Sequence, residues 1–545
     1  MILELKKGIR FKKELFLNGK NCFEIIDFEL KNKLFENALN KIDKEISEVA
    51  ELSKDKKEGL FFWCLTYDNH RADGVIGMVL DYYFIEIIEY LIKEFNEISE
   101  LKIHTLVTKS FKALLRKNFV FKIVDKTGVT EKIQYHLRFK LGPLKIILQI
   151  LAKSFFLRSS LKKNLSDDLV LILKPLRSTN TRLKGFPSFL ESKHSDVYFL
   201  DTSLLKIKKF GLSGEEYNIK TYKLSFFFKA FVKALKLTKD KYFFFREKDY
   251  NSIGFINYLS EQSFLQTYFI RIKTLAYEEV FKQLNPKCVV VSSTFGDPQK
   301  RMPLIIAKKL GIDTILFSCR PFITKMRSED RIIKPDLLEY NNSTLGNNIY
   351  IFDKPSFNHL LLSGFPQERI KIYNPQKNIV KDYINNYFYS NSILLLFAHP
   401  SYNNSIINLM GTLNKQGVKF ETILYREHPN DRLTNKQIQL LQDISDNLEC
   451  ISEKLWSDLK FSNVLSITSN STSGIDAVSR GATLLWLPFL TEHSIQFSQM
   501  INNLGYVANN KNEFSTFINN FINDKKFKRQ IEKKCETDYS NFIKF

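Results

Sequence analysis

Residues 420–429 read FETILYREHP, and residues 462–474 read SNVLSITSNSTSG. Each stretch passes from an apolar run of strand length directly into polar residues, as strands of a parallel sheet do where they end in a loop before a helix. Two further runs of the same kind are 392–400 (SILLLFAHP) and 482–489 (ATLLWLPF), and helix-like segments separate the four. This alternation predicts a doubly wound α/β sheet in the C-terminal third of the chain.

A second α/β series precedes this one. Residues 286–295 (PKCVVVSSTF) and 313–318 (DTILFS) predict parallel strands on either side of a helix at 302–311. We therefore predict an α/β fold of GT-B type, with two Rossmann-like doubly wound domains facing a central cleft. We expect an acceptor-side domain with helical insertions at residues 1–375 and a linker at 376–392. A nucleotide-sugar-binding domain at 393–525 and a final helix at 526–545 that crosses back should follow.

Composition restricts the classes of function. The 545 residues carry a formal net charge of +22, which favours anionic partners. The six cysteines form no CxxC pair, so the pattern argues against a zinc site or a disulfide framework and favours the cytoplasm. No run of about 18 apolar residues predicts a membrane span.

Two stretches, 144–163 and 225–241, interleave Phe, Leu and Ile with Lys and Arg. They fit helices that lie on the anionic inner face of a membrane, and equally fit ordinary helices with one core face and one solvated basic face. The aromatic residues sit mostly in apolar runs rather than along a basic stripe, so nucleic acid is not an expected partner.

The polar residues after two of the strands are the strongest functional signal. Arg426, His428 and Pro429 follow one strand, and residues 469–473 (SNSTS) follow another and open a helix. Ligands of open parallel sheets bind at the carboxyl ends of strands. Hydroxyls and free N–H groups at a helix start, together with Arg and His side chains, can hold the phosphate of a leaving nucleotide.

Other phosphate-handling motifs are missing from the sequence. It contains no GxGxxG, no GxxxxGK[ST] and no Asp-x-Asp pair. We therefore expect no cofactor other than the donor substrate and no metal site, with histidine and helix dipoles stabilising the departing phosphate.

The stretches ILYREHPND and ITSNSTSGIDAVSRGATLLWLPF resemble bacterial GT-B enzymes that build surface polysaccharide, over roughly residues 286–530. Sialyltransferases, polysialyltransferases, Kdo transferases and teichoic-acid glycerophosphotransferases share these His-Pro and Ser/Thr motifs. The resemblance implies that His428, Ser471, Thr472 and Ser473 contact a CMP or CDP donor. Where many relatives carry Gln-His-Gly, this chain has Ser-Cys-Arg-Pro at 318–321, a departure on the acceptor side.

The remaining candidates lie near other expected strand ends. His399 could line the cleft, and Glu492 could bind the donor ribose or base. The proposed donor-binding set is Arg426, His428, Pro429, Ser469, Asn470, Ser471, Thr472, Ser473, Glu492 and His399. For the general base, the resemblance to sialyltransferases favours Asp73, which precedes Gly74, with Asp297 as its rival; His428 is the third expected catalytic residue.

The leading interpretation is a glycosyltransferase that moves a CMP-activated 2-keto acid sugar, of sialic acid, Kdo or related type, onto a bacterial surface glycan. The expected partners are a nucleotide-sugar donor, a free or lipid-linked glycan acceptor and the anionic inner membrane surface. The alternatives are a CDP-glycerol or polyol-phosphate transferase and a non-catalytic nucleic-acid-binding protein. A further option is a sugar-nucleotide epimerase of GT-B fold, which would need a cluster of catalytic acids in the cleft that the sequence does not clearly show.

Overall fold

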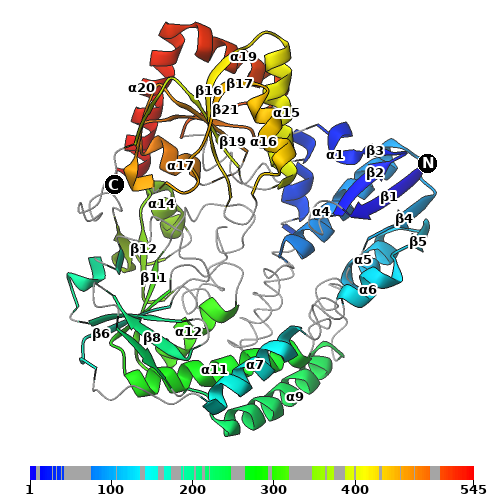
Figure 1. The fold of residues 1–545 in the computed structure, drawn as a ribbon. Helices are drawn as coiled ribbons and strands as arrows, with labels where there is room; N and C mark the ends of the chain where they lie inside the picture. The colour runs from blue at the N-terminus through cyan, green and yellow to red at the C-terminus, as the bar shows by residue number, and fades with distance from the viewer. Residues whose placement is uncertain are drawn as a thin grey trace.

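In a computed structural model, the described residues form three large sheets, of five, eight and six strands along the chain, and one further two-stranded sheet (Figure 1). Apart from short gaps within them, the described ranges are 1–41, 75–156, 165–173, 186–246, 264–291, 298–317, 346–373, 387–490 and 504–544.

The first sheet is formed by the N-terminal region, where the apolar residues of the sequence show no strong periodicity. Its strand order is β3-β2-β1-β4-β5, with bounds β1 Ile2–Lys7, β2 Lys13–Leu17, β3 Lys20–Asn21, β4 Glu100–Ile103 and β5 Lys122–Asp125. Strands β1 and β2 pair antiparallel, and β4 and β5 continue parallel to β1. Helices α1 (Cys22–Ile25), α4 (Val75–Glu94), α5 (Lys109–Asn118) and α6 (Val129–Tyr135) accompany it. The predicted 1–375 unit thus contains a sheet of its own before the expected one.

The middle sheet has eight strands in the order β13-β12-β11-β10-β6-β7-β8-β9. The bounds are β6 Leu169–Leu173, β7 Asp196–Leu200, β8 Lys206–Lys209, β9 Glu216–Asn218, β10 Cys288–Val291, β11 Asp313–Phe317, β12 Asn348–Ile351 and β13 Ile370–Ile372. Strands β6, β7 and β10 to β13 are parallel, and β8 and β9 extend the edge antiparallel. Since β10 (CVVV) is buried along its whole length, both faces of the sheet are covered there.

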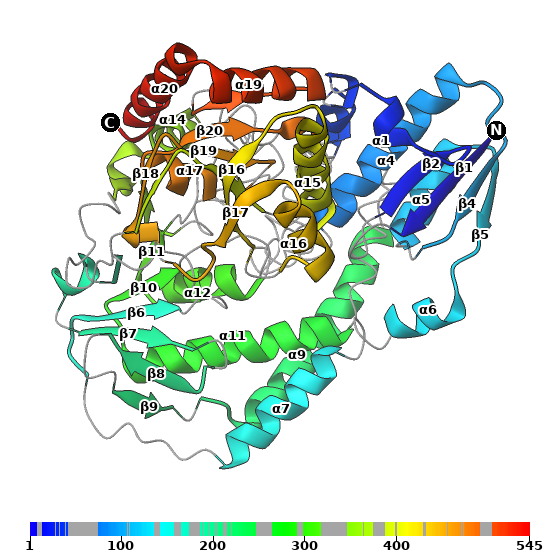
Figure 2. The same ribbon diagram turned by 45° about the horizontal axis from the view of Figure 1, so that its top comes forward.

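Helices cover the middle sheet and extend beyond it. They are α7 Gly142–Phe156, α9 Leu224–Arg246, α11 Phe264–Leu284, α12 Pro298–Lys309 and α14 Lys354–Leu362, with the 3-10 turn η5 at Gln367–Arg369. Helices α7 and α9 both pack against α11, and the three form the lower end of the molecule in both views (Figures 1 and 2). Among the described residues, no helix is both long and apolar enough to cross a membrane.

The C-terminal sheet has six parallel strands in the order β17-β16-β15-β19-β20-β21. The bounds are β15 Ile393–Leu396, β16 Phe420–Arg426, β17 Ser445–Cys450, β19 Leu465–Thr468, β20 Thr483–Trp486 and β21 Tyr506–Val507. Its helices and turns are α15 Pro400–Lys415, α16 Asn435–Gln442, η7 Trp456–Asp458, α17 Ser473–Val478, η8 Pro488–Leu490, α19 Lys511–Asn523 and α20 Lys525–Ile543. The four strands predicted from apolar runs are β15, β16, β19 and β20.

These two large sheets share one topology. From β15 the chain winds through β16 to β17 on one side, and then through β19 and β20 to β21 on the other. In the middle sheet the chain likewise winds from β6 through β7 and β8 to β9 on one side, and then from β10 through β11 and β12 to β13 on the other. The predicted fold class, an α/β fold with two doubly wound sheets as in GT-B enzymes, is confirmed.

Two details refine the expected division of the chain. The last part of the expected 376–392 linker is strand β14 (Tyr387–Ser390), which pairs parallel with β18 (Leu459–Ser462). Helix α20 packs against α14, and Phe542 shares one buried cluster with Phe352, Ile475 and Trp486. The C-terminal helix therefore joins the middle sheet unit to the C-terminal one.

Candidate functional site

The C-terminal sheet changes direction between β15 and β19. Loops that leave neighbouring strands in opposite directions open a crevice at the carboxyl edge, where ligands of doubly wound sheets bind. Strands β16 and β19 both neighbour β15, so their ends lie roughly 10 Å apart. Since the two sequence motifs follow β16 and β19, the fold brings them to one edge of one sheet.

The serines after β19 are closely tied to the sheet. The Thr468 hydroxyl donates to the carbonyl of Leu396 at 3.0 Å and accepts from the Ser471 N–H at 3.1 Å. The Ser471 hydroxyl accepts from the Ser473 N–H at 3.3 Å, as in a helix cap. Ser469 and Ser471 are buried, and Ser473 is half-buried at the start of α17. Ser471 thus helps to shape the turn into α17, whatever else its hydroxyl contacts.

Helix α17 lies unusually close to the sheet. A Cβ on Gly474 would come within 2.9 Å of the Leu484 side chain on β20 and 3.3 Å of Trp486. The Ser-Gly sequence at this point therefore allows the close helix–strand packing that places the serine turn against the carboxyl edge.

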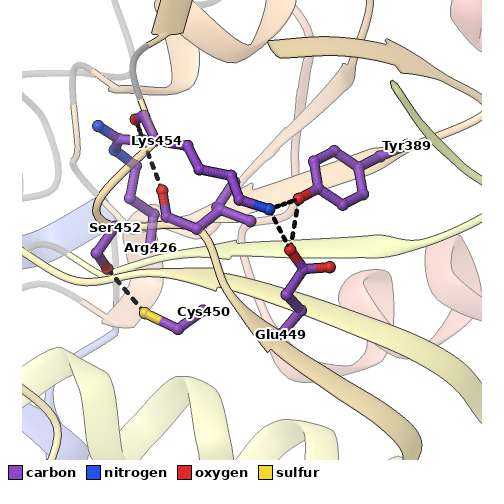
Figure 3. A network of polar contacts seen from close by, with 7 residues as sticks. Tyr389, Arg426, Glu449, Cys450, Ser452 and Lys454 are labelled. Carbon is purple, nitrogen blue, oxygen red and sulfur yellow. Dashed lines mark hydrogen bonds and ion pairs between the residues drawn. The ribbon is translucent and has the colours of Figure 1, made fainter. Parts of the chain in front are cut away.

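Arg426, at the end of β16, is held by the loop after β17. Its Nη1 donates to the carbonyls of Ile451 at 3.0 Å and Lys454 at 2.8 Å; Figure 3 shows Arg426 beside Lys454. The Cζ of Arg426 also lies 4.5 Å from the centre of the Trp456 ring. Burial lowers the pKa of Arg426, and the nearby carboxylate of Asp476 on α17 opposes that shift. Arg426 therefore positions the loop after β17 in addition to any contact with a ligand.

Glu427 fixes the backbone on both sides of His428. Its N–H donates to the Ser452 hydroxyl at 2.9 Å, and its carboxylate accepts from the Leu433 N–H at 2.7 Å. His428 follows directly and is half-buried. Hydrogen bonds therefore hold the backbone that carries His428.

A polar network that the sequence did not indicate lies next to Arg426. The Tyr389 hydroxyl donates to Glu449 at 2.5 Å, and the Lys454 ammonium contacts both groups (Figure 3). Burial alone would lower the pKa of Lys454, but its hydrogen bonds to Glu449 and Tyr389 raise it overall. Because Lys454 also supplies a carbonyl to Arg426, the network connects β14 to the carboxyl edge. The sequence predicts a linker between the two α/β domains at residues 376–392, and that pattern gives no reason to choose Tyr389 as a site residue.

Several predicted site residues lie outside the described residues, and their expected roles stay predictions. They are Asp73, Asp297, His399, Pro429, Asn470, Thr472 and Glu492. In the chain, Asp297 falls between β10 and α12, and Asp73 comes two residues before the start of α4. The described part of the chain holds no group of three His, Cys, Asp or Glu side chains placed to bind a metal ion.

Comparison with protein-family models and with curated protein sequences finds no match. Solved structures that are similar include UDP-GlcNAc 2-epimerase from Neisseria meningitidis bound to UDP-GlcNAc, with 13% identity and a TM-score of 0.40 over 69% of this chain and 96% of that one. S. aureus MnaA with UDP has 12% identity and a TM-score of 0.39 over 69% and 94%. Acinetobacter baumannii MurG has 8% identity and a TM-score of 0.36 over 68% and 95%. At such scores the strand order given above, rather than the superposition, carries the fold assignment.

Proposed function

We propose that this protein is a glycosyltransferase that moves a CMP-activated 2-keto acid sugar onto a bacterial cell-surface glycan, without a metal ion, in the cytoplasm. The observation that carries the proposal is the meeting of the His428 segment and the Ser469–Ser473 segment at the carboxyl edge, on both sides of β15. Nucleotides bind at this place in doubly wound folds. The choice of CMP and of a keto acid sugar rests on the His-Pro and Ser/Thr resemblance.

His428 and the serine turn have complementary roles in the proposed reaction. The bond between the anomeric carbon and the donor phosphate oxygen breaks, and negative charge grows on the leaving nucleotide. His428 and the hydroxyls of the serine turn donate hydrogen bonds to that charge. Hydrogen bonds of Glu427 with Ser452 and Leu433 hold the backbone that carries His428. The acceptor hydroxyl forms the new bond to the anomeric carbon and gives up its proton to a base.

We propose Asp73 as that base, with Asp297 as the alternative, if the transfer inverts the anomeric configuration. A carboxylate beside a partly desolvated site can take a proton from an alcohol as the bond forms. Asp73→Asn keeps the shape of the side chain and removes its basicity, so transfer should stop while donor affinity stays nearly unchanged. If Asp297→Asn shows this behaviour and Asp73→Asn does not, the assignment is reversed. If both variants transfer normally, neither is the base.

Nucleotide binding is the first test. In thermal-shift measurements with CMP, CDP, UDP and GDP, CMP at about 100 times its Kd should stabilise the protein by about 2.7 kcal/mol. His428→Ala should weaken CMP binding and lower turnover by about 100-fold or more. The matched control is His194→Ala, which removes a histidine that contacts Asp168 at 3.0 Å in the middle sheet unit.

The four nucleotides separate the alternatives. Stabilisation by UDP or GDP and none by CMP would refute the donor assignment and leave a sugar transferase of another specificity. Stabilisation by CDP with no transfer of a keto acid sugar would favour a polyol-phosphate transferase. Equal loss of CMP binding in His428→Ala and His194→Ala would show that His428 acts through stability alone. No response to any nucleotide would overturn the proposal.

A further inference from the structure

Helices α7 and α9 expose apolar side chains to solvent. On α9 these are Leu224, Phe228, Val232 and Leu235, and Phe228 keeps 71% of its surface exposed. Phe231 is partly exposed too, but its ring packs against Phe264 and Tyr268 of α11. On α7 the exposed apolar side chains are Leu144, Ile146 and Leu148. We call these side chains, with the lysines among them, the α7–α9 surface. Single exposed apolar residues are ordinary, but those of α9 recur at helical spacing and form a stripe along one side of the helix, as at an interaction site.

The core does not account for these side chains. Helix α9 already buries Phe227, Ala230 and Ala234, and α7 already buries Ile147 and Ile150. Most of these belong to the cluster that contains Ala276 and Val280 of α11. The inner faces thus attach both helices to the protein, whereas the outer apolar side chains stay exposed to solvent in the part of the chain that the structure describes.

The charges on these helices have one sign. Helix α7 (GPLKIILQILAKSFF) contains two lysines and no acidic residue. Helix α9 (LSFFFKAFVKALKLTKDKYFFFR) contains five lysines and one arginine against a single aspartate. Lys229 and Lys233 are exposed one turn apart, and they directly follow Phe228 and Val232, respectively. By contrast, Lys223, just before α9, is paired with Glu279 at 2.7 Å.

We propose that the α7–α9 surface docks on an anionic phospholipid bilayer, with the two helices lying in the interface. The apolar side chains would enter the boundary between headgroups and acyl chains, and the lysines would contact lipid phosphates. A second copy of the same surface would place lysines against lysines without carboxylates to pair them, so self-association through this face is disfavoured. A nucleic acid would match the charge and leave the Phe, Val and Leu side chains in water. This proposal does not depend on the proposed function.

Flotation of the full-length protein with vesicles tests the proposal. Vesicles of phosphatidylcholine with phosphatidylglycerol should bind the protein at low salt, and binding should fall with added salt and be weak on pure phosphatidylcholine. Lys229→Gln combined with Lys233→Gln should lower the partition coefficient by more than tenfold, since each lysine near an anionic surface contributes about fivefold. Phe228→Ser combined with Val232→Ser should lower it by about tenfold or more.

The controls place the same substitutions elsewhere on the surface. Lys525→Gln with Lys526→Gln changes two exposed lysines of α20, and Phe388→Ser removes a phenylalanine of β14 that is 66% exposed. Both should bind vesicles as the wild type does, and all variants should keep its melting temperature. The proposal is overturned if the wild type ignores anionic vesicles at low salt, if the α9 variants bind as well as the controls, or if sedimentation shows a dimer that the α9 substitutions dissociate.

Discussion

Arg426 stabilises the loop next to the candidate site through its hydrogen bonds and its stacking on Trp456. Arg426→Lys keeps the positive charge but removes the planar fork that reaches two carbonyls and stacks on Trp456. We expect the free energy of unfolding in urea to fall by about 1–3 kcal/mol. The control is Arg432→Lys in the same loop, where the side chain is 81% exposed and lies 3.9 Å from Glu453; it should change stability by less than about 0.5 kcal/mol. An unchanged Arg426→Lys would mean that the carbonyl contacts do not stabilise the fold.

Glu449 predicts a dependence of stability on pH. Burial raises the pKa of Glu449, but its hydrogen bonds with Lys454 and Tyr389 lower it further, so that the net value lies below the usual 4.5. A carboxylate with a depressed pKa stabilises the folded state above about pH 4.5, and the contribution is lost as the pH falls through the folded value. Lys454, whose pKa is raised above 10.5, stabilises below that pH and loses its contribution as the pH rises further.

Glu449→Gln should therefore lower the melting temperature at about pH 7, and the difference from the wild type should shrink at about pH 3. The effect is small, under about 1 kcal/mol, because the Glu449 side chain is 44% exposed. Calorimetry of both proteins at the two pH values measures it. A difference that grows in acid would contradict the sign of the pKa shift.

At the scale of elements, Gly481 controls how closely the turn after α17 approaches β18. Its φ is +97°, and an added Cβ would lie 2.4 Å from the carbonyl oxygen of Phe461. Gly417, after α15, has a similar φ of +92° but no atom within 4 Å of the added Cβ. Both Gly→Ala changes introduce left-handed strain of about 1–2 kcal/mol, and Gly481→Ala adds a backbone clash of about 1–3 kcal/mol. Denaturant unfolding of the two variants should show this difference, and equal losses would mean that the sheet yields at no cost.

At the scale of the whole molecule, Phe352 connects the middle and C-terminal sheet units. It is buried after β12 in the cluster that contains Ile475 of α17 and Phe542 of α20. Phe352→Ala should cost about 3–5 kcal/mol and should separate the melting of the two units in calorimetry. Phe514→Ala, which empties a site inside the C-terminal core, should destabilise without separating them. A single sharp transition in Phe352→Ala would show that other contacts suffice to couple the units.

The proposed reaction and the proposed membrane surface also belong to this scale. The serine turn and His428 lie in the C-terminal unit, whereas the α7–α9 surface lies beyond the middle sheet. Substitutions on one should therefore leave the other intact: Lys229→Gln with Lys233→Gln should keep nucleotide binding, and His428→Ala should keep vesicle binding.

The sequence by itself determined the strands whose burial is complete. Strands β15 (ILLL) and β20 (TLLW) are covered on both faces, so nearly every position is apolar and the run is visible in the sequence alone. Apolar runs of strand length likewise located the two motifs, because the polar residues follow them immediately. The doubly wound class followed from strands and helices in alternation.

Only the tertiary structure decided which strands pair and which side chains contact one another. Strand β17 (SDNLEC) lies at a sheet edge and alternates poorly, and β14 (YFYS) is mostly exposed, so neither carries a clear periodic signal. In the N-terminal hairpin, strand β1 pairs with β2 on one side and on the other side with β4, which follows almost a hundred residues later. The carbonyls that hold Arg426 and the Tyr389–Glu449–Lys454 network likewise come from segments far apart in the chain. Local composition determines where an apolar run lies. Which strand pairs with that run, and which group a side chain contacts, depends on packing between residues far apart in the sequence, and a single sequence does not show that packing.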